Sequence, residues 1–121
     1  MFELEFYEDE RGYSDVREFI KDLEAKAATS KDARINRNKV VAYLDILEEM
    51  GTRVGMPVTR HLDGDIWELR PLSNRILYAY YKDNRFLLLH HFIKKSQKTP
   101  KREIEQALRE LEDWIRRHGL L

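Results

Sequence analysis

The sequence predicts an α+β fold: a small antiparallel sheet packed by an N-terminal helical hairpin, with a further helix at the C-terminus. Two observations predict it. Two amphipathic segments with good capping residues follow an alternating segment, and three apolar runs then follow across connections of two or three residues. A helical hairpin can cover one face of such a sheet, and 121 residues suffice for one core, so we expect a single domain over residues 1–121.

The first two elements are a strand and a helix. The stretch FELEFYED, residues 2–9, starts by alternating apolar with acidic side chains, at the period of a half-buried strand. Ser14 is a good N-cap for a helix. The apolar positions of that helix lie at helical spacing and are Val16, Phe19, Ile20, Leu23 and Ala27.

A second helix is predicted after Ser30, which again offers a capping hydroxyl. Its inner face carries Val40, Leu44 and Leu47, and Gly51 predicts its end because glycine favours the conformation that closes a helix. Residues 51–65 contain glycine and proline without any periodicity, so we expect a loop there.

Three strands are predicted over residues 66–72, 75–81 and 85–93, and their short connections favour an antiparallel meander. Thr99 and Pro100 then predict the start of a helix, as its N-cap and first helical residue. Gly119 predicts the end of that helix. Its expected buried stripe consists of Ile104, Ala107, Leu108, Leu111 and Ile115.

The composition restricts the setting of the protein. The chain has no cysteine, which excludes a disulfide framework and a thiolate metal site. Its first residues are acidic where a signal peptide would be basic, and no apolar run approaches the length that spans a bilayer. We therefore expect a cytoplasmic protein with no membrane partner.

The charges are unevenly distributed although their sum is zero. Residues 70–102 carry nine lysines and arginines against Asp83 alone, a net charge of +8, so the rest of the chain carries −8. Five of these cations lie within nine positions after the last apolar run: Lys94, Lys95, Lys98, Lys101 and Arg102. A basic segment in an otherwise acidic chain can bind a polyanion on one side only.

Strand alternation places some of the basic residues together. Trp67 and Leu69 suit the core, so Glu68 and Arg70 should point to the opposite side. Arg70 and Arg75 flank a tight turn and can reach one region, and the lysine-rich segment leaves the neighbouring strand. A solvated surface charge, or an ion pair with Glu68, is the alternative role of Arg70.

No nucleophile triad, phosphate-binding glycine loop or zinc signature is present. His90 and His91 are adjacent on a strand and should point to opposite faces, so we expect no metal site and no cofactor. Cations with tyrosines and a histidine suit metal-free phosphate chemistry on RNA. There a ribose 2′-hydroxyl loses a proton, cations stabilise the phosphorane, and the 5′-oxygen gains a proton.

Residues 61–108 resemble toxins of the RelE/ParE superfamily, in the HigB-like branch that includes phage-derived relatives. The matching features are LDGDIWELR, the arginine that opens RILYAYY, the strand LLHHF and above all FIKKSQKTPKREI. The resemblance implies a RelE-like fold and the toxin of a type II toxin–antitoxin pair. Such a toxin is a ribosome-dependent mRNA endonuclease that stops translation without a metal, leaving a 2′,3′-cyclic phosphate and a 5′-hydroxyl.

The resemblance also implies partners: the ribosome and its mRNA, and a cognate helix-turn-helix antitoxin similar to HigA. Operator DNA would be contacted indirectly, through the complex with that antitoxin. Two alternatives stay open. Some relatives poison DNA gyrase, as toxins of the ParE type do, and a non-catalytic nucleic-acid-binding module would carry the same cations.

Site residues follow position by position from the same resemblance. The expected catalytic residues are Arg70, Arg75, Lys94, Lys98 and His90, and the expected substrate-binding residues are Tyr81, Lys95 and Lys101. The arginines would hold the scissile phosphate, and Lys98 or Lys94 would transfer protons. His90 is either catalytic or structural, Tyr81 could stack on a base from an open face, and Glu68 is an alternative base.

Overall fold

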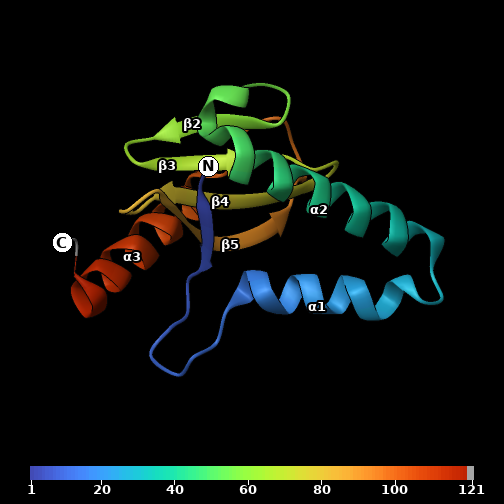
Figure 1. The fold of residues 1–121 in the computed structure, drawn as a ribbon, viewed down its shortest axis with the longest axis horizontal. Coiled ribbons are helices and arrows are strands. Elements are labelled where there is room, and N and C mark those ends of the chain that lie inside the picture. The colour runs from blue at the N-terminus through green and yellow to red at the C-terminus, as the bar shows by residue number, and fades with distance from the viewer. Residues whose placement is uncertain (120–121) are drawn as a thin grey trace.

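The computed structural model describes residues 1–119, and these form one sheet with helices on both faces (Figure 1). The elements in chain order are β1 (Glu3–Phe6), α1 (Asp15–Ala27), α2 (Lys31–Met50), the short 3₁₀ helix η1 (Gly51–Val54), β2 (Thr59–Asp63), β3 (Ile66–Leu69), β4 (Asn74–Tyr80), β5 (Arg85–Ile93) and α3 (Lys101–His118). The predicted α+β class, with a helical hairpin before the sheet and a helix after it, is confirmed.

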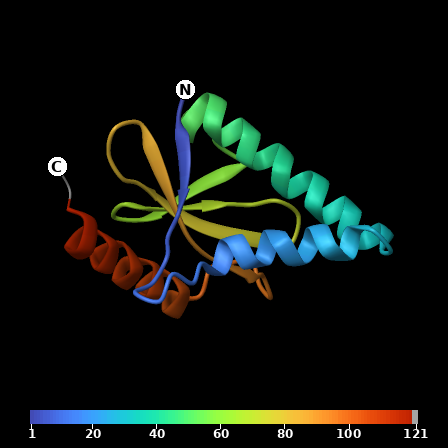
Figure 2. The same ribbon diagram turned by 60° about the horizontal axis from the view of Figure 1, so that its bottom comes forward.

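The sheet has the strand order β1-β5-β4-β3-β2. β2 to β5 form an antiparallel meander, and β1 joins its far edge parallel to β5. The hairpin of α1 and α2 lies on one face, and α3 lies on the other (Figures 1 and 2). In the part of the chain that the structure describes, no helix is long and apolar enough to cross a membrane.

Each face of the sheet has its own core, as strand alternation requires. Under the hairpin, Val16, Val40 and Leu47 pack against strand residues such as Ile76 and Tyr78. Under α3, a second set of buried side chains packs together, including Ile66, Leu77, Ala79, Leu87, Leu89, Ala107, Leu111 and Trp114. Because both faces are covered, β4 and β5 are apolar on both sides.

The helix boundaries confirm the expected caps for the hairpin. The Ser14 hydroxyl accepts a hydrogen bond from the Arg17 amide, and the Ser30 hydroxyl accepts one from the Ala33 amide, both at 3.2 Å. Gly51 ends α2 and Gly119 ends α3, each with a positive φ.

Three expectations for the middle of the chain and the last helix are wrong. The segment 51–65 is not a plain loop, because it contains η1 and the edge strand β2. β2 pairs with β3, but its sequence lacks the apolar alternation from which a strand is predicted. Thr99 is not the N-cap of α3. Pro100 takes that position without a side-chain bond, because the Thr99 hydroxyl is engaged elsewhere. Leu108 is exposed, and Trp114 takes its place in the core.

We expect the substitution Gly51→Ala to destabilise the protein by about 2–4 kcal/mol. Gly51 has φ +64° and ψ −155°, a region essentially restricted to glycine, and a Cβ there would lie 2.6 Å from the Phe2 ring. Gly12→Ala is the matched control, because Gly12 also has positive φ but its Cβ would meet nothing within 4 Å. Urea unfolding should show about 1 kcal/mol for the control, and equal losses would contradict the steric role of Phe2.

Candidate functional site

The sheet register aligns the polar residues of the site on the face that carries α3. Arg60 on β2 lies opposite Glu68 on β3, Glu68 opposite Leu77 on β4, and Leu77 opposite His90 on β5. Residues opposite one another point to the same side of a sheet, so this row shares one face. Arg75 and Phe92 form the next opposed pair on it.

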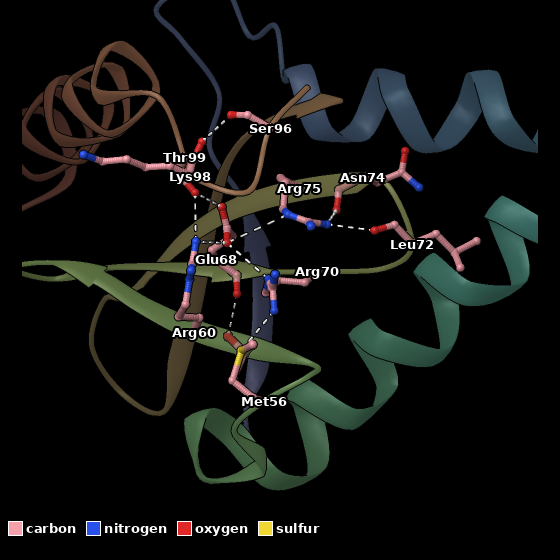
Figure 3. A network of polar contacts seen from close by, with 11 residues as sticks. Met56, Arg60, Glu68, Arg70, Leu72, Asn74, Arg75, Ser96, Lys98 and Thr99 are labelled. Atoms are coloured by element: carbon pink, nitrogen blue, oxygen red, sulfur yellow. Dashed lines mark hydrogen bonds and ion pairs between the residues drawn. The ribbon is translucent and has the colours of Figure 1, made fainter. Parts of the chain in front are cut away.

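Glu68 is the centre of the site and is completely buried. Its Oε1 atom lies 3.3 Å from Arg60 Nη2, 3.4 Å from Arg70 Nε and 3.9 Å from Arg75 Nε (Figure 3). Its Oε2 atom accepts a hydrogen bond from the Thr99 hydroxyl. The pairing of Arg70 with Glu68 that the sequence left open is therefore present, and two further guanidinium groups join it.

The turn between β3 and β4 holds Arg75 in place. One of its terminal nitrogens, Nη1, donates to the carbonyls of Leu72 and Asn74, each at 2.8 Å. Leu72 has φ +59°, a left-handed conformation unusual for a residue with a branched side chain, and it turns its carbonyl towards this guanidinium (Figure 3). Arg75 is only 6% exposed, so its position is tightly determined.

The charge at this site is not balanced. Three guanidinium groups face one carboxylate, and the buried Nε atoms of Arg60 and Arg70 have no hydrogen-bond acceptor within residues 1–119. Burial lowers the pKa of Arg75, Glu68 opposes this, and the charges of Arg70 and Arg60 lower it further. Unsatisfied buried donors cost free energy, so this arrangement favours an incoming anion.

The basic segment after β5 closes over the same place. A small cleft of about 10 Å³, room for about one water, is lined by Arg75, Phe92, Lys94, Lys95, Ser96, Gln97, Lys98, Thr99 and Pro100. The Lys94 amide donates to the Ser73 carbonyl at 2.9 Å, which ties the segment to the β3–β4 turn. Arg75 and three of the predicted lysines are therefore brought together, and Arg70 joins them through Glu68.

His90 lies apart from this cleft, and its surroundings favour the structural role over the catalytic one. It is 2% exposed under α3, with Nδ1 2.6 Å from Glu110 Oε1 and Nε2 3.0 Å from Glu103 Oε1. Burial alone would lower the pKa of His90, but the two carboxylates outweigh it, and the pKa is raised. Both ring nitrogens are occupied, which leaves the structural alternative.

Tyr81 is also misplaced by the sequence prediction. It is 6% exposed in the core under α3, and its hydroxyl donates to the Gly119 carbonyl. It also lines a hollow of about 200 Å³ together with Lys82 and Arg85, and this hollow shares no lining residue with the cleft over Arg75. Lys101, the first residue of α3, is exposed and does not line the cleft. Glu68 has no exposed surface for a base to work from.

Sequence reasoning missed Arg60 and Thr99. Arg60 lies in the segment expected to be a loop. The one usable signal was that only five residues separate it from the strand that ends in Glu68–Leu69. Thr99 was assigned a helix cap. His90 and His91 do point to opposite faces, towards α3 and towards Asp15 of α1. No group of three or more metal-ligating side chains occurs among residues 1–119.

Replacing Glu68 by glutamine should lower the unfolding free energy by about 3 kcal/mol or more, because the arginines around it lose their counter-charge inside the protein. Urea unfolding measures this loss. The matched control is Glu5→Gln, since Glu5 pairs with Arg85 in an ion pair that is partly exposed on both sides. It should cost less than about 1 kcal/mol, and a similar cost for both changes would contradict a special role of Glu68.

The raised pKa of His90 predicts that stability falls in alkaline solution. The stabilisation by His90 is complete below the ordinary histidine pKa of about 6.5 and is lost as the pH rises through the higher folded-state pKa. Urea unfolding from pH 6 to pH 9 should show this loss for the natural protein. It should be smaller for His90→Gln, which has no proton to lose, and an unchanged pH dependence in that variant would refute the assignment.

The chain matches a known protein family over most of its length. The family model described as "Phage derived protein Gp49-like (DUF891)" matches residues 17–112, which is well over half of the 121 residues and includes the whole arginine cluster and the basic segment. No curated protein matches the chain. The chain therefore belongs to the Gp49-like family of phage-derived proteins, a family associated with RelE-like toxins.

Proposed function

We propose that the protein is the toxin of a type II toxin–antitoxin pair and that it acts as a ribosome-dependent mRNA endonuclease without a metal. The HigB-like resemblance of residues 61–108 supports this, as does membership of a family associated with RelE-like toxins. The proposed partners are the ribosome with its mRNA and a helix-turn-helix antitoxin, through which the toxin would contact operator DNA.

One observation carries the proposal: the excess of guanidinium charge around Glu68. Arg60, Arg70 and Arg75 approach a single carboxylate, and the Arg60 side chain is 36% exposed, so part of this excess can be reached from solvent. Holding such an excess is unfavourable unless the site also receives an anion. A phosphodiester matches it, because arginine presents planar donors to phosphate oxygens.

The chemistry would proceed by in-line transfer within the RNA. The 2′-oxygen gives its proton to a base and forms a bond to phosphorus, the bond from phosphorus to the 5′-oxygen breaks, and the leaving oxygen takes up a proton. The cleft over Arg75 has room for one oxygen-sized group, so Arg75 would contact one oxygen of the phosphorane and stabilise the negative charge that develops there. Arg70 would add to the positive potential from its place beside Glu68. The products would be a 2′,3′-cyclic phosphate and a 5′-hydroxyl.

Proton transfer is assigned to Lys98 or Lys94, because both line the cleft next to Arg75. Lys98 is exposed and can reach an incoming strand, whereas Lys94 is half-buried. Lys95 lines the same cleft and would contact the RNA backbone. The neutral net charge does not oppose docking, since the basic residues are concentrated on this part of the molecule.

Induction of the protein in bacteria, followed by mapping of new 5′ ends on translated mRNA, tests the proposal. Arg75→Ala should reduce cleavage by about 10²–10³-fold, as expected for loss of one transition-state donor. Lys98→Ala changes an exposed side chain and should also reduce cleavage without disturbing the fold. Arg109→Ala, which removes an exposed cation from α3, is the matched control and should cleave like the natural protein.

Other outcomes identify the alternatives. Growth arrest with intact mRNA and a DNA-damage response would reject the endonuclease in favour of gyrase poisoning. RNA binding that Arg75→Ala weakens, with no cleavage by the natural protein on ribosomes, would leave only a nucleic-acid-binding module.

A further inference from the structure

A second, larger cleft adjoins the one above Arg75. It measures about 260 Å³ and is lined by Phe92, Ile93, Lys95, Pro100, Arg102 and Glu103. By the same measure the cleft over Arg75 has room for about one water, so this cleft is far larger and admits a planar ring. Phe92, Lys95 and Pro100 line both clefts, so the two are neighbours with Phe92 in the wall of each.

Phe92 is held in a defined position. On β5 it lies directly opposite Arg75, and it packs partly buried against the core under α3. Its ring is 6.3 Å from that of His90, whose two glutamate partners keep the start of α3 in place. An aromatic ring held this rigidly loses little conformational entropy when another ring stacks on it.

The charges around the two clefts differ in a way that distinguishes their ligands. Around Arg75 the lining side chains with charge are all cations, whereas the larger cleft includes the carboxylate of Glu103 and more apolar surface from Ile93 and Pro100. Glu103 is ion-paired with His90 and with Arg102, which lowers the positive charge of this cleft and makes it a poorer place for a phosphate than the cleft over Arg75. Binding of an uncharged ring does not depend on that charge, and Lys95 can contact the backbone to which the ring is attached.

We propose that the cleft beside Phe92 binds the base of a nucleotide in single-stranded RNA whose phosphate lies at Arg75, with the base stacked on the Phe92 ring. This inference rests on the proposed function and names the part of the RNA that the site recognises. It gives Phe92 the stacking contact that the sequence had assigned to the buried Tyr81. Phe92 is thereby a substrate-binding residue.

A binding experiment with uncleavable RNA tests the inference. The probe is a fluorescein-labelled six-nucleotide 2′-O-methyl RNA, compared with the same backbone carrying abasic residues, and affinity is read from fluorescence anisotropy at low salt. One stacked base contributes about 1–3 kcal/mol, so the natural protein should prefer the base-containing strand about tenfold or more. Phe92→Leu should reduce that preference to about twofold or less, and Phe92→Tyr should retain it.

Two control variants distinguish recognition of the base from binding of the RNA backbone. Tyr13→Leu removes an exposed aromatic ring that lines neither of the two clefts and should behave like the natural protein. Arg75→Ala should weaken both strands by a similar factor. Full preference for bases in a folded Phe92→Leu variant, verified by its melting temperature, would overturn the base site alone. Failure of the natural protein to bind either strand would also overturn the base site, whereas the proposed function fails only if induction produces no new 5′ ends on translated mRNA.

Discussion

The carboxylate of Glu68 has no solvent contact, and it determines how the residues at one end of this molecule are arranged. A charge in that position is tolerated only when cations and hydrogen-bond donors surround it. Arg60, Arg70, Arg75 and Thr99 meet this requirement, and they come from β2, the β3–β4 turn, β4 and the segment before α3. One buried anion therefore joins the two strands that neighbour β3, and the β3–β4 turn, to Thr99, which lies 31 residues further along the chain.

The positive charge around Glu68 exceeds the negative charge of its carboxylate. Three guanidinium groups exceed what one carboxylate can neutralise, and the lysines at 94, 95 and 98 raise the local positive charge further. The arrangement stays folded because the excess lies at the margin of the sheet, where Arg60 and the lysine side chains reach solvent. Glu68 thus positions the arginines, while their surplus charge is what makes the site attractive to a phosphodiester.

The core under α3 separates the surroundings of His90 from the site around Glu68. His90 lies one strand beyond Leu77 in the same row as Glu68, yet its environment is opposite in sign: two glutamates of α3 enclose a histidine. The face is thus divided between a basic region open to solvent and a region sealed by a helix. Phe92 lies at the boundary, and the cleft beside it combines apolar surface with charges from both sides.

Local pattern was enough for most of the architecture, because caps and alternation act over a few residues. Ser14, Ser30 and Gly51 delimit helices through bonds within one turn, and alternation separated Glu68 from Trp67 and Leu69, which pack under the hairpin. The exceptions all depend on partners far along the chain. β2 can be identified only from its pairing with β3. The Thr99 hydroxyl bonds a carboxylate 31 residues away instead of capping the helix. His90 and Tyr81 are covered by the C-terminal helical segment. Whether a side chain faces solvent depends on what packs over it, and the alternation within a strand does not show which of its faces a helix further along the chain will cover.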